Sequence, residues 1–524
     1  MPAHVAYDCV VVGGGHAGSC AALSAAEYGC QRVLIIDKCP KDWSGGNGYF
    51  TAGAHRTVHD GLHDLLPIVN NVSPELASSI DMDPYTADQF TWDIMRLGES
   101  RSDPNLVKAL VDGSRDAVRW LAEYVRVPFT FSFNRQAYEV NGRQKFWGGM
   151  VLSVQDGGKG LIAAHHKALE RERIEVWYDS PAVELVMERG RVVGVLVERQ
   201  GEVIQISAGA VILACGGFES SPELRRKHLG DSWIRARVRG TPYNTGDGIS
   251  IASSIGAKLT GDWSGCHSTC WDVHAPINHG SRTLSNQFTK SGYPLGIMVN
   301  TSGLRFVDEG ADFRNYTYAK YGRAILNEDD GAAWQVFDGK IIKWLREEEY
   351  GNDVAELVWA QSINELGDRM AEDGLKSKET FLKTVTSFNE AILTHHHENP
   401  HLEWNPSIKD NLSTQSTSTS LSPPKSNWAL PIDCPPFLAV KVSCGITFTF
   451  GGLAIDPESG GVLSAKSGNN GETRVIEGLF CTGEMVGGLF YGNYPGGSGL
   501  TGGAVFGRKA GREAAKLNKV FRTP

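Results

Sequence analysis

The stretch that decides the fold lies near the start of the chain and reads YDCVVVGGGHAGSCAALSAAEYGCQRVLIIDK, residues 7–38. An apolar run of strand character leads into a glycine turn, then a helical run, then a second apolar run. Gly13, Gly15 and Gly18 form the pattern G-x-G-x-x-G, and Asp37 ends the second apolar run, 19 residues after Gly18. This spacing predicts a strand–helix–strand unit of the doubly wound α/β class.

The residue types in this unit suit the binding of a dinucleotide. Glycines allow a tight turn and let a pyrophosphate approach the start of a helix, where unpaired N–H groups favour negative charge. Asp37, followed by Lys38, stands where a carboxylate accepts a hydrogen bond from a ribose hydroxyl. We expect His16, inside the turn, near the pyrophosphate or solvent. A chance glycine turn is the alternative, but strand, helix, second strand and acid all fall in register.

The overall composition is that of a globular protein rich in glycine. Of 524 residues, 61 are glycine, and apolar runs flank most of the clusters, which favours backbone packed against a ligand. The length predicts two or three domains. The net charge of −9, without a basic block, argues against a nucleic-acid partner. We expect no membrane span, because no apolar run approaches the ~18 residues of a membrane helix.

The ten cysteines are scattered, without a C-x-x-C pair or a complete set of metal ligands. We therefore expect reduced thiols and no metal site. The start of the sequence lacks the basic flank and cleavage site of a signal peptide, so the expected location is cytoplasmic.

A second glycine-rich stretch, SGGNGYFTAGAHR at residues 44–56, favours FAD over NAD, because such a loop can line the rest of a long cofactor. It is similar to the SGGN segment that hydrogen-bonds the flavin in the fumarate reductase/succinate dehydrogenase flavoprotein superfamily. Further segments resemble that family in the same order, over nearly the whole chain: AGAVILACGGFE (208–219), TGDGISIASSIGAKL (245–259), VNTSGLRFVDEG (299–310) and GLFCTGEMVGG (478–488).

The resemblance implies a cofactor site assembled from both ends of the chain. NYPGGSGLTGG, residues 493–503, precedes a helical run, and its family counterpart lies at the flavin ring. Backbone N–H groups at a helix start favour the negative charge of reduced flavin. No histidine motif of the covalent type is present, so we expect noncovalent FAD. The implied cofactor-binding residues are Gly13, Gly15, Gly18, Asp37, Lys38, Ser44, Gly45, Gly46, Asn47, Ala214, Cys215, Gly216, Asp247, Glu484, Ser498, Gly499 and Leu500.

Several departures separate the chain from fumarate reductases. Tyr494 stands where those enzymes have an arginine that clamps a substrate carboxylate. ITFTFGG, residues 446–452, replaces a segment that carries a carboxylate-binding histidine. The form YPG resembles ketosteroid dehydrogenases, where the tyrosine polarises a carbonyl, and also proteins grouped with tricarballylate dehydrogenase. With GDWSGCHSTCWD and NWALP added, the chain most resembles the tricarballylate dehydrogenase-like branch.

The chemistry implied by the resemblance is hydride transfer between a substrate carbon and flavin N5, with proton transfer at the adjacent carbon. Four residues after Glu309, where fumarate reductases have a catalytic arginine, stands Phe313, which cannot move a proton; Arg314 is next to it. His267 falls at a substrate-side histidine of the family. Salt-bridging and buried structural roles are the alternatives. The predicted catalytic residues are Arg314, Tyr494, His267, Tyr316 and Tyr318.

The substrate is a small molecule, and two classes are open. The leading hypothesis is a tricarballylate-like polycarboxylate, whose charge could be met by Arg56, His267, Arg314 and Lys425. The alternative, a larger ketone or natural-product intermediate, is favoured by Tyr494, Phe448, Phe450 and Phe490. A flavin-binding interaction protein without turnover is a third hypothesis. The electron acceptor is unknown; a separate iron–sulfur protein, a quinone and oxygen are the candidates.

The order of motifs implies a discontinuous Rossmann-like FAD-binding domain of the α/β class, residues 1–262 and 440–524, with an inserted α+β capping domain, residues 263–439. Apolar residues at three- and four-residue spacing predict helices over 345–372 and 378–396 in the cap. NLSTQSTSTSLSPPKS, residues 411–426, is predicted to be a flexible surface loop.

Overall fold

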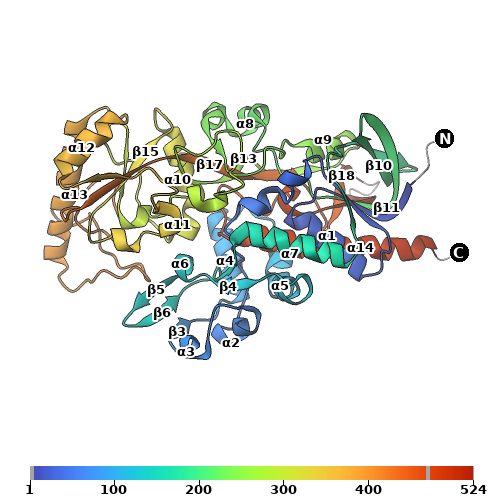
Figure 1. Cartoon of the computed structure of the whole chain (residues 1–524), viewed down its shortest axis with the longest axis horizontal. Coiled ribbons are helices and arrows are strands. Elements are labelled where there is room, and N and C mark those ends of the chain that lie inside the picture. Colours follow the sequence, from blue (N-terminus) through green and yellow to red (C-terminus); the bar gives the residue numbers. More distant parts are fainter. Residues whose placement is uncertain (1–4, 468–472, 523–524) are drawn as a thin grey trace. The chain divides into compact units, whose positions relative to one another are not determined.

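The computed structural model describes residues 5–467 and 473–522 and divides the chain into two compact units (Figure 1). The first unit comprises residues 1–230, 239–266 and 447–524, and the second comprises residues 231–238 and 267–446. The capping role of the middle segment, and its limits at 263 and 439, stay predictions. Within the described residues, we find no helix with both the length and the apolar character needed to cross a bilayer.

The first unit is built on an eight-stranded sheet whose centre is parallel. The spatial order is β18-β19-β11-β1-β2-β8, and β10 and β9 extend antiparallel from β11. β1 pairs in parallel with β2 and β11, which places the glycine turn at the carboxyl end of the central strand. The strands are β1 Val5–Val12, β2 Val33–Ile36, β8 Glu175–Trp177, β9 Ala182–Glu188, β10 Arg191–Arg199, β11 Glu202–Leu213, β18 Gly461–Ser467 and β19 Thr473–Cys481.

Two helices from opposite ends of the sequence lie side by side on this sheet. α1, His16–Glu27, follows the glycine turn, and α14, Ser498–Arg522, is the last helix (Figure 1). Their backbones touch because small residues line the contact. A methyl group added at Gly507 would lie 2.8 Å from the carbonyl oxygen of Ala17. The predicted strand–helix–strand unit and the fold class are therefore confirmed.

The remaining elements of the first unit pack around this sheet or form two small sheets, β3-β6-β5 and β4-β7. They are α2 Leu62–Leu65, α3 Pro74–Ala77, β3 Ile80–Met82, α4 Ala87–Leu97, α5 Pro104–Trp120, β4 Phe129–Phe131, α6 Phe133–Gln136, β5 Ala137–Val140, β6 Arg143–Phe146, β7 Leu152–Val154, α7 Gly157–Arg171, α8 Pro222–Leu229 and α9 Asp247–Ser254.

The second unit is α+β. Its sheet runs in the order β12-β17-β15-β14, with β13 and β16 also paired to β17. The strands are β12 Arg237–Val238, β13 Leu259–Asp272, β14 Ile297–Asn300, β15 Ala333–Phe337, β16 Val358–Ala360 and β17 Phe437–Leu453; of these, residues 259–266 of β13 and 447–453 of β17 belong to the first unit. The helices are α10 Tyr318–Asn327, α11 Glu347–Tyr350, α12 Ile363–Glu372 and α13 Lys378–Glu398.

The two helix predictions for this unit had different outcomes. The predicted helix over 378–396 is confirmed by α13. The continuous helix predicted over 345–372 is wrong, because α11 ends before Gly351 and the chain then forms β16 before α12 begins. Val358–Ala360 pairs with β17, so tertiary pairing of a short apolar run overrides its helical spacing.

The segment 411–426 has internal order that its composition did not indicate. Gln415 and Ser420 form a bridge, and Lys425 is buried. The Lys425 ammonium donates to the carbonyl oxygens of Pro294 (2.8 Å) and Gly296 (2.6 Å). Flexibility of this segment stays a prediction.

Candidate cofactor site

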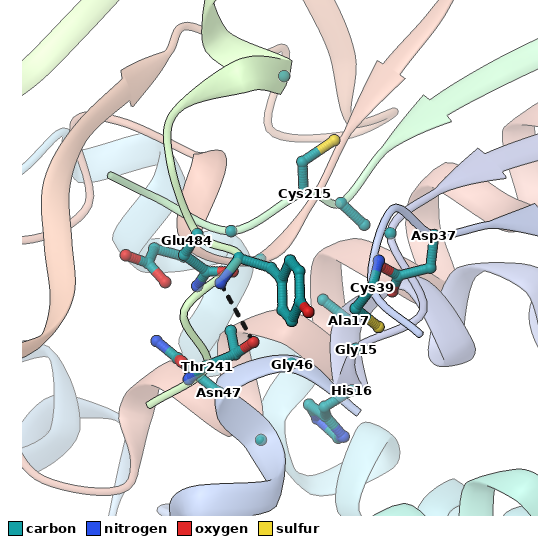
Figure 2. A pocket seen from close by; sticks show the side chains of 18 of the residues that line it. Gly15, His16, Ala17, Asp37, Cys39, Gly46, Asn47, Cys215, Thr241 and Glu484 are labelled. Atoms are coloured by element: carbon teal, nitrogen blue, oxygen red, sulfur yellow. Dashed lines mark hydrogen bonds between the residues drawn. The ribbon is translucent and has the colours of Figure 1, made fainter. Parts of the chain in front are cut away.

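One cavity of the first unit gathers most of the residues predicted to bind the cofactor. Its lining includes Gly13, Gly15, Asp37, Lys38, Gly46, Asn47, Ala214, Cys215, Gly216, Asp247, Glu484, Tyr494, Gly499 and Leu500. The predicted contacts Gly18, Ser44, Gly45 and Ser498 lie outside that lining. Figure 2 shows Asp37 and the turn of Gly15 and Ala17 on one side, with Asn47, Thr241 and Glu484 on the other.

The first glycine turn has room for a ligand on one face only. A methyl group added at Gly13 would lie 2.3 Å from Ala214 O, and one at Gly18 would lie 1.9 Å from Gly13 O. At Gly15 the nearest atom to such a methyl is Gly45 O, 3.7 Å away. Gly13 and Gly18 are therefore required by packing, while the backbone at Gly15 faces the space where a pyrophosphate fits.

Backbone donors fix Asp37 at the end of β2. Its Oδ2 accepts from the N–H of Gly14 (2.8 Å) and its Oδ1 from that of Cys39 (3.0 Å). The carboxylate is thus held beside the glycine turn, as ribose recognition requires. Lys38 and Asp247 were both predicted to contact the cofactor. Their side chains form an ion pair with each other, and both residues line the cavity.

Asn47 ties the second glycine stretch to two other segments. Its amide nitrogen donates to Glu219 Oε1 (2.5 Å) and to the carbonyl of Thr447 (2.7 Å), and its amide oxygen accepts from Thr241 N (2.9 Å). The preceding Gly46 has a φ of 54°, a left-handed conformation that glycine adopts without strain.

A buried pair of carboxyl groups stands behind this network. Glu219 Oε1 also accepts from Asn244 Nδ2 (2.6 Å), and Glu484 Oε1 accepts from Thr449 N (2.7 Å) and Oγ1 (3.0 Å). Burial raises the pKa of Glu219, and burial together with the charge of Glu219 raises that of Glu484 further. The sequence pointed to Glu484 but missed Glu219, although it closes the segment AGAVILACGGFE.

The C-terminal glycine loop supplies backbone donors to the cavity. α14 begins at Ser498, so the N–H groups of its first turn have no partner within the helix. The Ser498 hydroxyl is buried and has no hydrogen-bond partner among the described residues. A methyl added at Gly499 would lie 3.8 Å from the Tyr494 ring and 3.9 Å from the Phe448 ring. A planar ligand group can therefore lie against this turn, beneath aromatic side chains.

Four aromatic side chains form one cluster at this end of the cavity. Tyr494 lies 5.7 Å from Phe448, 6.1 Å from Phe450 and 5.2 Å from Phe490, measured between ring centres. Tyr494 and Phe448 line the cavity. This end of the cavity is therefore aromatic.

Arg56, a predicted carboxylate partner, is committed to the protein itself. Its side chain is fully buried, and Nε donates to Gly496 O (2.9 Å). Nη1 donates to the Tyr85 hydroxyl (2.9 Å) and pairs with Asp93 (3.2 Å). Arg56 therefore anchors the C-terminal glycine loop through the carbonyl oxygen of Gly496. Lys425, bound to two backbone carbonyls, is likewise occupied.

The other predicted catalytic residues belong to the second unit. The rings of His267 and Tyr318 meet edge to face with centres 6.0 Å apart. Arg314 is buried and opens a short turn that ends at Tyr316. The structure thus brings His267 and Tyr318 together, while catalytic roles for all four stay predictions.

The donor set fits FAD: a glycine cradle at a helix start, an oriented acid at the end of β2, and a second helix start whose residues Gly499 and Leu500 line the cavity. Comparison with known proteins agrees. The family model described as FAD binding domain matches residues 75–500, and the model for glucose inhibited division protein A matches residues 8–52.

Known proteins similar to this chain are redox enzymes. A "Probable fumarate reductase" of Shewanella frigidimarina is 28% identical, over 97% of this chain and 74% of that protein. A 4-oxocyclohex-2-ene-1-carboxylate 5-dehydrogenase of Sinomonas cyclohexanicum is 24% identical, over 98% of this chain and 94% of that protein. The solved 3-ketosteroid delta1-dehydrogenase of Sterolibacterium denitrificans shares the fold, with a TM-score of 0.70 at 18% identity over 98% of this chain and 99% of that one. The chain belongs to the FAD binding domain family, within the fumarate reductase/succinate dehydrogenase flavoprotein superfamily, and is an FAD-dependent oxidoreductase that acts on C–C bonds.

Proposed function

We propose that this enzyme dehydrogenates, or reduces, a C–C bond next to the carbonyl of a largely apolar ketone. The observation that carries the proposal is the aromatic cluster of Tyr494, Phe448, Phe450 and Phe490 at the end of the cavity where Gly499 stands. Apolar rings favour an alicyclic or aromatic substrate body over a polycarboxylate. The relative that acts on 4-oxocyclohex-2-ene-1-carboxylate supports a ring ketone.

Each protein group has a defined task in this proposal. Bound FAD supplies the acceptor or donor of a hydride. The N–H groups of Gly499 and Leu500 hold the flavin ring, and the Tyr494 hydroxyl donates to the substrate carbonyl, which stabilises enolate-like charge. Arg314, His267, Tyr316 or Tyr318 moves the proton at the adjacent carbon. The cavity-lining His16 uses both ring nitrogens for internal hydrogen bonds, which supports noncovalent FAD.

A tricarballylate-like polycarboxylate is the second candidate substrate. The buried Arg314 guanidinium and His267 support it, since both can donate to carboxylates. The internal commitments of Arg56 and Lys425 weigh against it, because a trianion needs several cations. Dehydrogenation passes the electrons to an acceptor outside this chain, for which an iron–sulfur protein, a quinone and oxygen are the candidates; reduction would instead take them from an electron donor.

An anaerobic substrate screen tests the proposal by following the visible absorbance of bound flavin. Cyclic ketones should bleach oxidised flavin, or enones should reoxidise the reduced form, while tricarballylate and citrate leave it unchanged. The reverse pattern would favour the polycarboxylate, and no response to either class would reject the proposed activity.

Tyr494→Phe tests the assigned role of the hydroxyl. Loss of one donor to a developing enolate should slow flavin reduction about 10²-fold or more, with the flavin still bound. Tyr491→Phe, in the same loop but outside the cavity lining, is the matched control and should reduce at the wild-type rate. Equal rates in all three proteins would remove Tyr494 from the mechanism.

A further inference from the structure

Three buried imidazoles stand beside the cofactor cavity: His16 at the start of α1, His55 near the end of the second glycine-rich stretch, and His165 in α7. His55 and His165 are fully buried and His16 is 5% exposed. Burial lowers the pKa of His16 to about 4 and that of His55 to about 3, and it holds the pKa of His165 well below its ordinary value. All three are therefore neutral at pH 7, and His16 is neither exposed nor charged, unlike a side chain facing solvent.

The hydrogen bonds fix which nitrogen of His16 carries the proton. Nε2 lies 2.9 Å from the carbonyl oxygen of Leu500, which can only accept, so Nε2 must donate. Nδ1 of the neutral ring is then an acceptor, and His165 Nε2, 2.8 Å away, donates to it. His165 Nδ1 is left as a buried acceptor without a partner among the described residues. The result is a directed chain from His165 through His16 to Leu500.

This chain joins the two halves of the cofactor cradle. His16 belongs to the glycine turn after β1, and Leu500 belongs to the first turn of α14, 484 residues further along. The packing there is close, since a methyl added at Gly503 would lie 3.2 Å from His16 Cδ2. The imidazole therefore packs closely against the first two turns of α14.

We propose that His16, oriented by His165, is a positioning residue that aims the N–H groups of Gly499 and Leu500 at the flavin ring. The inference rests on the proposed contact of the ring with these two residues. N–H groups at this helix start would favour the negative charge that a bound flavin gains on reduction, so their alignment would tune both FAD affinity and the reduction potential.

The same atoms meet a simple criterion for metal binding, and distance decides between the two explanations. His16, Cys20 and His165 each offer one ligand atom, and these atoms lie within 4.8 Å of one another. Two nitrogens that each bind zinc at ~2.0–2.1 Å in tetrahedral geometry stand well over 3 Å apart. The observed 2.8 Å is instead the length of a direct N–H···N hydrogen bond.

Substitutions at His16 separate positioning from simple packing. His16→Gln keeps an N–H that can reach Leu500 O, whereas His16→Leu keeps volume and loses the donor. His16→Leu should weaken FAD binding roughly tenfold, the size of one lost hydrogen bond, and should lower the midpoint potential of bound flavin. His16→Gln should recover most of both. His166→Leu, at the neighbouring position of α7, is the control and should match wild type.

Three results would overturn the inference. They are an unchanged FAD Kd and potential in His16→Leu, a His16 ring protonated at Nδ1 by ¹⁵N NMR of the wild-type holoenzyme, and stoichiometric metal that His165→Leu releases. The NMR measurement needs no variant, so it decides even if His16→Leu fails to fold. A holoenzyme that shows the expected shifts but turns over no C–C substrate would instead reject the proposed function alone.

Discussion

His55 shows how burial of one side chain creates a pH dependence. Its Nδ1 donates to Gly53 O (2.9 Å), and its ring packs edge-on against Phe129. Its pKa falls from 6.5 to about 3 in the folded protein, chiefly through burial. In the unfolded chain the His55 ring binds a proton near pH 6.5, whereas in the folded protein it stays neutral until about pH 3. Its contribution to the free energy of unfolding is therefore fully present above pH 6.5 and declines as the pH falls from there toward 3.

His55→Asn should therefore lose less stability than wild type between pH 7.5 and pH 5. The Asn amide can replace the donor to Gly53 O but does not titrate. Urea unfolding at both pH values measures the loss in free energy of unfolding for each protein. Glu219 and Glu484 contribute in the opposite direction, because their raised pKa values favour the folded state at low pH. Their contribution is the same in both proteins, so it cancels when the two losses are subtracted. Equal losses in both proteins would contradict a buried neutral His55.

Single residues also show what a sequence reveals. Asp37 was predicted from its offset to the glycine turn, and Asn47 and Glu484 from segments that resemble those of the family; all three line the cavity. Glu219 and the His16–His165 contact were missed, because their partners lie far apart in the chain and only tertiary packing joins them. For Arg56 the sequence left open a carboxylate ligand, a surface charge and a salt bridge within the FAD domain. The structure shows the salt bridge, and its partner Asp93 could not be identified from the sequence.

At the scale of elements, the contact of α1 with α14 depends on glycines spaced four residues apart. A methyl at Gly511 would lie 2.3 Å from Ala21 O and 2.8 Å from Ala25 N, both backbone atoms that cannot yield. Gly511→Ala should force the helices apart and destabilise the protein by about 1–3 kcal/mol. Gly502→Ala is the control, since its nearest neighbour would be a side-chain atom 3.8 Å away.

The control should be neutral or stabilising, because alanine favours a helix interior over glycine by about 1 kcal/mol. Urea midpoints of the two variants, with FAD saturating, give the comparison. If Gly511→Ala were as stable as Gly502→Ala, the helices would tolerate separation. The close contact of α1 with α14 would then not be needed to hold the two helix starts at the cofactor site.

Across the whole molecule, the fold class and FAD were predictable because motifs report them locally: a glycine turn, an acid after a strand, a second glycine loop. Substrate identity was not, because it depends on which side chains the chain folding brings together at the cavity end. Tyr494 and Phe448 are 46 residues apart in sequence (494 minus 448), yet their rings lie 5.7 Å apart. The sequence named these aromatic residues as candidates, but only the fold shows that the two segments form one cluster.

The cofactor should act as a structural tie of the first unit. The cavity lining runs from Val12 to Gly503, and every lining residue belongs to that unit. A ligand that binds only the folded state at about 100 times its Kd adds about 2.7 kcal/mol to stability. FAD should therefore raise the unfolding temperature of apoprotein in proportion to the logarithm of its concentration, while NAD should not.

Ile392→Val, in the core of the second unit, should lose about 1 kcal/mol of stability and leave the FAD Kd unchanged. An unfolding temperature independent of FAD, or a shifted Kd in Ile392→Val, would contradict a cofactor held by the first unit alone.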